Sequence, residues 1–453
     1  MSSIRSYIPP MSKLTPQQRA ILEAPLTDAS IVVVNAYAGT GKTRTLAALA
    51  AVLKRTHVYI SFNVAVADSS PVQPATTLDA LNVAAWTDVK GAPPVFCDSF
   101  TVDGCPDASV LYDTINAWAC SDDASITAAH VPTDHPYPWV DIATCVVDES
   151  LTGKRPITHA LLQAWVTRPI PYDVILVDEA QDLNPRQVAY LLAHRGPRVF
   201  IGDPHQSIYG FRGANDRMRR LEAVATARYE LTQTFRFGPP LTNVVHALTG
   251  LELTGTGRTN VYAPGEYAVD AFIARTQLGL FGAFVVYQAQ PKPSRVLGRS
   301  LLLFKRWLEL ASTNLDTAQG NDLRALELVP RGFKPKQVLS LMGSGVVFST
   351  VHSCKGLEFE FVALVDDFRV CGMGVSEGKK SERRRVGRRR RSSRASASRT
   401  SSSRVIRKSR GISLTEERNL IYVAITRARR GLVLNTSINS LDNVQQWISQ
   451  SSP

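Results

Sequence analysis

The chain has 453 residues, 44% hydrophobic and 20% charged, a composition typical of a globular protein with several domain-sized units rather than a disordered or fibrous chain. No apolar run approaches the roughly 18 residues of a membrane-spanning helix, and the first residues lack the apolar block of a secretory signal, so we expect no membrane partner. The six Cys form no Cys-x-x-Cys pair and match no structural zinc spacing, which argues against a disulfide scaffold or a zinc centre.

The net charge of +13 comes from one segment. Residues 379–410 hold fifteen Lys or Arg and one Glu, whereas the remainder of the chain carries 37 basic and 38 acidic residues. An Arg/Ser run of this kind repels itself, so we expect a disordered loop over 376–411. Four interpretations stay open: a nuclear-import signal, a non-specific DNA clamp, a switch controlled by phosphorylation, and a tolerated loop without a function. We favour nuclear localisation with auxiliary DNA binding.

The N-terminal half alternates between helical and strand patterns. A helix near residues 15–24 precedes a buried strand at 31–35, a Gly-rich loop, a second helix and a strand at 57–62. Residues 69–170 are rich in Pro, Asp, Ala and Thr with weak periodicity, which predicts an inserted, partly helical subdomain. Buried strands return in DVILVDEA and RVFIGDP. We therefore assign 1–68 and 171–224 to a first domain and 69–170 to the inserted subdomain.

A second α/β unit is predicted from residue 225 onward. Short apolar segments such as AFIARTQ, VVFSTV, FVALVDD and GLVLNT favour parallel strands covered by helices on both faces. The stretch 291–345 contains the helical run SLLLFKRWLELAS and predicts a short second insertion, so 225–290 and 346–453 form the second domain. The fold class expected is therefore α/β, with two parallel-sheet domains and two inserted, mainly helical subdomains.

The segment IVVVNAYAGTGKTRTL at 31–46 joins a buried strand to a helix through a phosphate-binding loop. Glycine allows the amides of Gly39, Thr40 and Gly41 to point inward, and the following helix directs its positive N-terminal end at an anion. Lys42 is expected to contact the β- and γ-phosphates, and the Thr43 hydroxyl to bind Mg²⁺. The sequence departs from the general pattern at one point, because Ala36 stands where a Gly is usual.

The segment VILVDEAQD supplies two carboxylates at the end of another buried strand. Asp178 is expected to hold Mg²⁺, and Glu179 to orient and polarise the attacking water, as phosphoryl transfer to water requires. A phosphate loop with these two carboxylates predicts a nucleoside triphosphatase that uses Mg²⁺. These residues do not specify which process the hydrolysis of the triphosphate drives.

Seven motifs in order give the chain a family resemblance: AYAGTGKT, ISFNVAVA, VDEAQD, GDPHQSIYGFRGA, LTQTFRFG, STVHSCKGLEFE and NLIYVAITRARRGL. Together they resemble the UvrD/Rep-type superfamily 1 DNA helicases and, among these, most closely the F-box DNA helicases, over residues 14 to 440. The resemblance implies two RecA-like domains that bind ATP and Mg²⁺ between them. No F-box-like region is present, so a ubiquitin-ligase partner is not expected.

The resemblance also carries nucleotide-site roles onto individual residues. Arg236 and Arg427 match arginines that reach across from the second domain, where an arginine finger is worth roughly 10³ to 10⁵ in kcat. The other matches are Gln18 for the adenine edge, Gln206 for sensing the γ-phosphate, Phe235 for stacking on adenine, Glu358 for the ribose, and Ala38 and Arg44 at either end of the phosphate loop.

For nucleic acid, the resemblance implies contacts from both domains. Aromatic residues stack on bases of any sequence, each stack being worth about 1–3 kcal/mol. The matched positions are Phe62, Asn63, Thr77, Phe211, Arg212, His352 and Lys355. Within TTLDAL, Asp79 stands where the family usually has His, and a carboxylate is unfavourable beside a phosphate backbone.

The function expected from this resemblance is an ATP-dependent DNA helicase or translocase that moves 3′ to 5′ on single strands and acts at single-strand/duplex junctions. Its processes would be replication, recombination or repair, in the nucleus if the basic segment is an import signal. Two alternatives stay open. The first is a protein that uses ATP as a switch to clamp DNA or displace other proteins, and the second is a helicase that acts on RNA.

Overall fold

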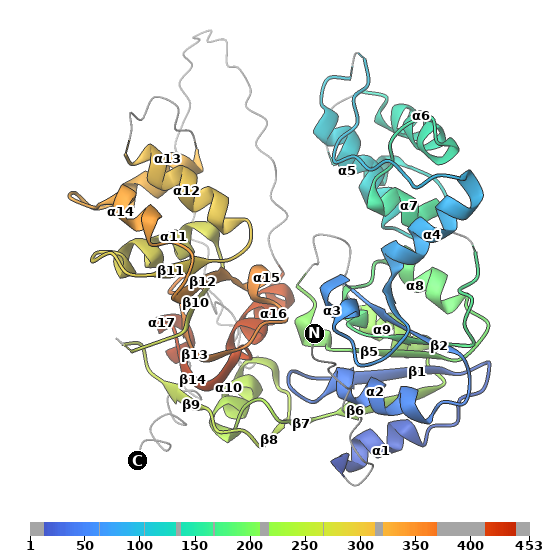
Figure 1. Ribbon diagram of the computed structural model, residues 1–453, viewed down its shortest axis with the longest axis horizontal. Helices are drawn as coiled ribbons and strands as arrows, with labels where there is room; N and C mark the ends of the chain where they lie inside the picture. The colour runs from blue at the N-terminus through green and yellow to red at the C-terminus, as the bar shows by residue number, and fades with distance from the viewer. Residues whose placement is uncertain are drawn as a thin grey trace, which may run out of the picture.

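The computed structural model of the protein describes residues 13–62, 64–103, 105–132, 137–165, 168–208, 217–265, 267–312, 320–368 and 413–440. The predicted disordered loop at 376–411 lies outside the described residues. Figure 1 shows two lobes side by side, each built around its own sheet, with the first half of the chain in one and the second half in the other. Across the described ranges, every helix is too short or too polar to cross a membrane.

The first lobe is built on a parallel six-stranded sheet in the order β3-β2-β4-β5-β1-β6. Its strands are β1 (Ile31–Ala36), β2 (His57–Ser61), β3 (Ala75–Thr77), β4 (Val174–Val177), β5 (Arg198–Gly202) and β6 (Ala227–Leu231). Its helices are α1 (Pro16–Leu22), α2 (Lys42–Val52), α3 (Val64–Asp68), α8 (Pro185–Leu192) and α9 (Arg217–Val224), with short 3₁₀ turns η3 (Ala180–Asp182) and η4 (Pro204–Gln206).

Helices cover both faces of this sheet because successive strand residues point to opposite sides. In β1, Val32 and Val34 pack in one core with Leu46 and Leu49 of α2, whereas Val33 packs in the other core with residues of α8 and α9. Both faces are therefore apolar, which explains the continuous apolar runs in the sequence. Because β4, β5 and β1 are parallel neighbours, their carboxyl ends lie at the same edge of the sheet, where the phosphate loop begins.

The inserted subdomain stands beyond α8 and β2 of the first lobe (Figure 1). It contains α4 (Leu78–Lys90), α5 (Ala108–Ala119), η2 (Ala128–His130), α6 (Trp139–Thr152) and α7 (His159–Trp165) around a core of its own. Arg186 of α8 fastens it to the first lobe by donating to the carbonyl oxygens of Ala119 at 3.1 Å and Asp123 at 2.9 Å.

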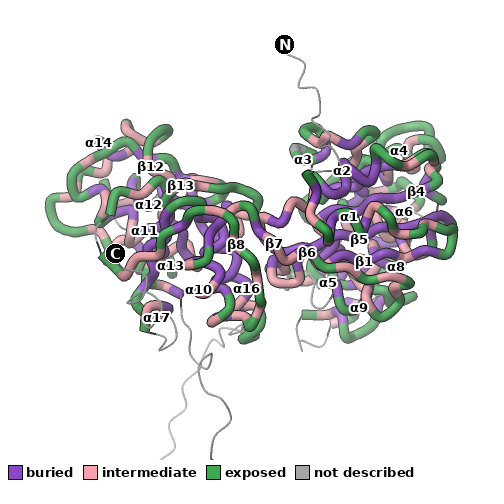
Figure 2. Tube along the Cα trace, turned by 90° about the horizontal axis from the view of Figure 1, so that it is seen from below, coloured by how far each residue is buried: buried purple, intermediate pink, exposed green. Residues whose placement is uncertain are grey.

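The second lobe contains another parallel six-stranded sheet, in the order β11-β12-β10-β13-β14-β9. Its strands are β9 (Asn260–Tyr262), β10 (Ala271–Ala274), β11 (Ser294–Val296), β12 (Val346–Thr350), β13 (Phe359–Leu364) and β14 (Ala428–Val433). Its helices are α10 (Pro239–Thr249), α11 (Gln277–Tyr287), α12 (Ser300–Leu310), α13 (Asn321–Glu327), α14 (Pro335–Ser340), α15 (Val351–Cys354), α16 (Leu414–Ile425) and α17 (Thr436–Asn439). A two-stranded ladder, β7 (Gln233–Thr234) with β8 (Thr254–Gly255), lies where the chain passes between the lobes. Figure 2 shows that buried residues follow the sheets and that exposed residues form the outer surface of both lobes.

The predicted fold class and its main strands are confirmed, but three predicted boundaries are wrong. The second domain cannot begin at 225, because β6 pairs in parallel with β1 in the first sheet. The first insertion begins after β3, since residues 75–77 pair with β2, and the second begins after β11, since 294–296 pair with β12. These three strands are at or next to sheet edges and are short or partly exposed, so they lack the apolar run that marks a buried strand.

Candidate functional site at the junction of the two domains

The phosphate loop has the backbone that its sequence predicts. Gly39 and Gly41 adopt φ values of +75° and +85°, a region that L side chains rarely enter. Gly41 is the N-cap of α2 and no side chain caps this helix, so its first amides are free to bind an anion. Lys42 follows directly and donates to the Ala36 carbonyl oxygen at 3.4 Å. The loop therefore fits a phosphate group by shape and by charge.

Asp178 lies at the centre of the predicted metal site. It follows β4 and is 4% exposed, and its Oδ2 accepts hydrogen bonds from the Tyr59 hydroxyl at 2.6 Å and the Thr43 hydroxyl at 3.1 Å. The Glu179 amide donates to Oδ1 at 2.8 Å. A hydroxyl and a carboxylate oxygen are ligands that Mg²⁺ prefers, and Mg²⁺ at phosphate sites commonly takes only one or two protein ligands. The residues thus fit the ion, and Thr43 and Asp178 would hold it.

The two adjacent carboxylates differ in their electrostatic surroundings. Burial and the neighbouring Glu179 raise the pKa of Asp178 above its ordinary value. Burial alone would raise the pKa of Glu179 too, but Lys42 and Lys355 lower it below its ordinary value. Glu179 is also the single described non-glycine residue with positive φ, at +53°, a conformation that concentrates at functional sites. A charged Glu179 is suited to accept a hydrogen bond from water.

Gln206 reaches the same region from η4. Its side-chain amide donates to Asp203 Oδ2 at 2.7 Å, and it is 4% exposed. The Asp203 amide donates in turn to Gln181 Oε1 at 2.9 Å, and Gln181 Nε2 donates to Glu179 Oε2 at 2.6 Å. The predicted γ-phosphate sensor and the predicted water-orienting carboxylate thus belong to one hydrogen-bond network.

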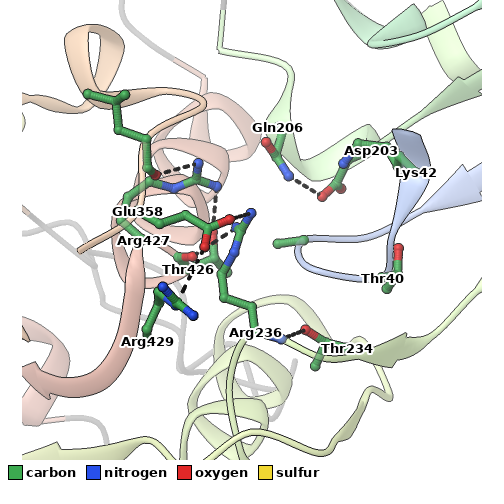
Figure 3. Close-up of polar contacts among 12 residues, drawn as sticks. Thr40, Lys42, Asp203, Gln206, Thr234, Arg236, Glu358, Thr426, Arg427 and Arg429 are labelled. Atoms are coloured by element: carbon green, nitrogen blue, oxygen red, sulfur yellow. Dashed lines mark hydrogen bonds and ion pairs between the residues drawn. The ribbon is translucent and has the colours of Figure 1, made fainter. Parts of the chain in front are cut away.

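Arg236 is the second-domain residue that comes next to the phosphate loop. A Cβ placed on Gly39 would lie 2.5 Å from Arg236 Cβ, so the two backbones are in close contact. The guanidinium is paired with Glu358 at 2.5 Å and donates to the Thr426 carbonyl oxygen at 3.1 Å, while its buried Nε has no hydrogen-bond partner (Figure 3). Arg236 is therefore positioned at the junction, with its charge held by Glu358.

Arg427 lies behind Arg236 and does not face the phosphate loop. It is 1% exposed, and its guanidinium donates to the carbonyl oxygens of Val423 at 2.9 Å and Leu357 at 3.2 Å. Burial and the nearby Arg236 lower the pKa of Arg427 to about 10. Of the two arginines expected to reach across from the second domain, Arg236 lies beside the phosphate loop and Arg427 does not. For Arg427 to touch a phosphate, it must first exchange these acceptors.

The residues predicted to bind the base differ in accessibility. Gln18 is 1% exposed, and its amide nitrogen donates to Thr45 Oγ1 at 3.2 Å and to the Thr40 carbonyl oxygen at 3.4 Å. Its oxygen accepts from the Thr15 amide, so the structure uses Gln18 to position the phosphate loop and shows no free edge for adenine. Phe235 is 47% exposed, and its amide donates to the Gly39 carbonyl oxygen at 2.9 Å, which leaves its ring open to a base beside the loop.

The remaining residues predicted to bind the nucleotide, Ala38, Thr40 and Arg44, make hydrogen bonds within the protein. Ala38 donates its amide to the Tyr422 hydroxyl at 3.0 Å, and the Thr40 hydroxyl donates to the Tyr37 carbonyl oxygen at 2.8 Å. Arg44 is exposed and donates to the Lys13 carbonyl oxygen at 3.5 Å, so it lies on the outer surface of α2.

Of the predicted nucleic-acid contacts, Phe62 has the expected exposure, at 41%, where β2 ends. Asn63, Phe211 and Arg212 lie outside the described residues. Thr77 is 6% exposed because its hydroxyl caps α4 by accepting from the Ala80 amide.

Two further residues predicted to bind nucleic acid, Lys355 and His352, contact other parts of the protein. Lys355 was predicted to face a phosphate, but its ammonium is paired with Asp182 at 2.5 Å and donates to the Gln206 carbonyl oxygen at 2.9 Å. The side chain is 10% exposed, so in this conformation it links the two domains rather than contacting DNA. His352 approaches the Ile208 carbonyl oxygen at 3.2 Å, a second contact between the domains.

Asp79, the departure from the family pattern, has a structural partner in the inserted subdomain. Its carboxylate accepts from Gln163 Nε2 at 2.6 Å and lies 3.6 Å from His159, so it joins α4 to α7.

Four residues of the site were missed by sequence reasoning: Tyr59, Asp182, Asp203 and Tyr422. Each is buried, and each lies within or next to a motif, but its neighbours in sequence gave no sign of a polar partner far along the chain. A buried Tyr in an apolar run resembles any core residue, so only the three-dimensional contact distinguishes it.

Comparisons with known proteins find two family models on this chain. The UvrD/REP helicase N-terminal domain matches residues 148–221, and the UvrD-like helicase C-terminal domain matches residues 334–439. The F-box DNA helicase 1 of Gallus gallus is 26% identical over 529 residues, covering 95% of this chain and 50% of the relative. The F-box DNA helicase protein 1 of Schizosaccharomyces pombe is 25% identical over 544 residues, covering 96% of this chain and 59% of the relative. The chain thus spans between half and three fifths of the length of these relatives.

Among solved structures, the arterivirus nonstructural protein 10 helicase in complex with DNA covers 93% of this chain and 64% of its own, at 12% identity and a TM-score of 0.35. The PRRSV helicase covers 90% of this chain and 53% of its own, at 12% identity and a TM-score of 0.33.

Proposed function

The chain carries the N- and C-terminal domains of UvrD-like helicases, and from this premise we propose that it is an ATP-driven DNA helicase. The observation that supports this most is the arrangement at the junction. The phosphate loop, Asp178, Glu179 and Gln206 lie on one domain, and Arg236 meets the loop from the other. A site shared by two domains couples hydrolysis to their relative motion, which a motor requires.

Bound ATP would bring the phosphoryl group, and Mg²⁺ would neutralise its developing charge. The protein contributes positioning and electrostatics. Lys42 and the first amides of α2 bind the phosphates, Thr43 and Asp178 hold the metal, and the charged Glu179 orients water.

Arg236 completes the site when its guanidinium leaves Glu358. The ion pair is 2.5 Å long with both partners partly accessible, the side chains being 15% and 39% exposed, so its exchange for a triphosphate is favoured by the larger charge of the ligand. Domain movement that accompanies this exchange supplies the step along DNA.

Single-stranded DNA is the proposed track, with 3′ to 5′ movement and action at junctions taken from the family resemblance. Phe62 supports a DNA face at the carboxyl ends of the first sheet, since an exposed ring there can stack on a base. Nuclear localisation through the basic segment at 379–410 is also a proposal, and imaging of a fluorescent fusion with and without that segment tests it.

ATP hydrolysis titrated with single-stranded DNA, duplex DNA and RNA tests the proposed function, beside a strand-displacement assay. We expect single-stranded DNA to stimulate hydrolysis most and Lys42→Ala to abolish it, because that lysine neutralises the transferring phosphates. Lys54→Ala is the matched control, since Lys54 is exposed just beyond the end of α2. Undiminished turnover by Lys42→Ala would overturn the proposal. Stimulation without strand displacement would indicate a DNA-bound switch or translocase, and stimulation by RNA alone an RNA helicase.

A further inference from the structure

The Tyr422 hydroxyl lies at the contact between the two domains. Tyr422 is on α16 of the second domain, is 0% exposed, and accepts a hydrogen bond from the Ala38 amide of the phosphate loop at 3.0 Å. The same hydroxyl donates to Asp203 Oδ2 at 3.0 Å. One oxygen atom of the second domain is thus bonded to two separate segments of the first.

Asp203 connects this hydroxyl to the groups expected to act on ATP. It is 0% exposed, and its Oδ2 also accepts from Gln206 Nε2 at 2.7 Å. Its backbone amide donates to Gln181, whose side chain holds Glu179. Moving the Asp203 carboxylate would therefore displace the γ-phosphate sensor and the water-orienting carboxylate together.

The surroundings fix the direction of these hydrogen bonds. Burial and the nearby Asp203 raise the pKa of Tyr422 well above its ordinary value, so the phenol keeps its proton and donates it to the carboxylate. The ring of His205 packs with its centroid 5.5 Å from that of Tyr422, which limits tilting of the phenol. A hydrogen bond to a charged acceptor in a buried place is stronger than one between neutral groups.

Both arginines are linked to the end of α16, the helix of Tyr422. Arg427 follows the C-cap residue Thr426 directly, and Arg236 donates to the Thr426 carbonyl oxygen. Figure 3 places Asp203 and Gln206 on the side of the phosphate loop, and Arg236 and Arg427 on the opposite side. Among the described residues, the Tyr422 hydroxyl joins the two sides by direct contact with the loop backbone and with Asp203.

We propose that Tyr422 is a positioning residue of the ATPase reaction: its hydroxyl sets α16, and with it the two arginines, in register with the phosphate loop and Gln206. This inference rests on the proposed function, since it assigns a role within that reaction. Tyr422 contacts no reacting atom, so its effect is transmitted through Asp203 and the Ala38 amide. Binding of ATP to the loop needs one domain, whereas turnover needs both in register. Loss of the hydroxyl should therefore affect kcat more than KM.

The test compares steady-state ATP hydrolysis, saturated with single-stranded DNA, for wild type and Tyr422→Phe, which keeps the ring and removes the hydroxyl. We expect kcat to fall about tenfold and KM for ATP to change by less than about twofold, as for loss of one charge-assisted hydrogen bond. Tyr190→Phe is the matched control, because its hydroxyl donates to the Arg168 carbonyl oxygen at 2.8 Å, away from the junction, and it should retain wild-type kcat.

A double-mutant cycle with Asp203→Asn adds a readout that a merely structural role would not move. If the two groups act as a unit, Tyr422→Phe should lower kcat much less in the Asp203→Asn background than in wild type. Additive effects, an unchanged kcat, or a fall matched by Tyr190→Phe would each overturn the inference.

Two further outcomes separate this inference from the proposed function. A wild-type protein without DNA-stimulated hydrolysis would contradict the proposed function itself. Amide hydrogen exchange over residues 37–41 tests the contact independently of turnover, and it should be faster in Tyr422→Phe than in wild type. Unchanged exchange would overturn the positioning role even if the protein were inactive.

Discussion

The structure places Lys355 in a buried ion pair with Asp182, whereas the family resemblance places it at a DNA phosphate, and a stability measurement distinguishes the two. The pair joins the domains at 2.5 Å, with side chains 10% and 2% exposed, and the Lys355 ammonium also donates to the Gln206 carbonyl oxygen. The perturbation is Lys355→Met, which keeps the length of the side chain and removes its charge. If Lys355 instead faces a DNA phosphate, this change would leave the stability of the protein unaltered.

The expected loss follows from the carboxyl group left behind. Burial raises the pKa of Asp182 to about 6, so at pH 7 the charged carboxylate is favoured over the protonated form by only roughly 1–2 kcal/mol. Without Lys355 the carboxyl of Asp182 would take up a proton, so its contribution to the loss cannot exceed roughly 1–2 kcal/mol. The lost hydrogen bond to Gln206 adds about 1 kcal/mol. Lys355→Met should therefore lower the free energy of unfolding by roughly 2–3 kcal/mol.

Urea unfolding at pH 7, followed by circular dichroism, measures this loss. The double variant Lys355→Met/Asp182→Leu should return to within about 1 kcal/mol of wild type, because replacing both partners by apolar groups leaves no buried carboxyl without its partner. Lys336→Met is the control, since Lys336 is exposed on α14 of the same domain. Wild-type stability in Lys355→Met, together with weaker DNA binding and a shallower salt dependence, would refute this reasoning and favour a phosphate contact.

Two further variants test the geometry of the site. Gly39→Ala should destabilise the protein and depress ATP hydrolysis, because its φ of +75° is strained for Ala and the added Cβ would lie 2.5 Å from Arg236 Cβ. Gly91→Ala is the control for backbone strain alone, since Gly91 has a φ of +74° and no atom within 4 Å of an added Cβ. Thermal melting of the two variants separates the effect of strain from that of the close contact. For pH dependence, burial raises the pKa of Asp182 from 3.8 to about 6, so between these values the native state holds a proton that the unfolded state has lost. The contribution of Asp182 to stability therefore falls as pH rises from about 4 to 6, by about 3 kcal/mol, and Asp182→Asn should flatten that part of a urea-unfolding profile measured against pH.

Much of the fold could be predicted because its strands are buried on both faces. Segments such as 174–177 and 198–202 are wholly buried in parallel sheets, and such strands produce apolar runs that can be recognised one at a time. The edge strand β6 alternates between half-buried and exposed positions, with only its last residue buried, and β3 has only three residues, so pattern alone places both outside the first sheet. Pairing of such strands depends on neighbours distant in sequence, which a local pattern does not contain.

The residues of the site likewise fall into those that could be predicted from the sequence and those that could not. The phosphate loop and its carboxylates could be located because each needs a local backbone geometry, strand then turn, that the sequence itself encodes. The partners of Gln18 and Lys355 could not, since these side chains bond to Thr45 and Asp182 through contacts that exist only after folding. The family resemblance assigns Gln18 and Lys355 contacts with ATP and DNA. In this structure Gln18 is buried, the Lys355 side chain is only 10% exposed, and both are bonded within the protein, so they are not accessible to those ligands.

The central claim is that ATP is hydrolysed between the two domains with the second domain supplying a guanidinium from Arg236. The most direct test is single-turnover hydrolysis by Arg236→Ala with DNA bound, with ATP affinity measured in parallel by equilibrium binding. Arg430→Ala is the control, because Arg430 is an exposed arginine on β14 paired with Glu360 at 2.8 Å. We predict that Arg236→Ala lowers the hydrolysis rate by about 10³-fold or more while retaining ATP binding. Hydrolysis at the wild-type rate would contradict a site shared between the domains.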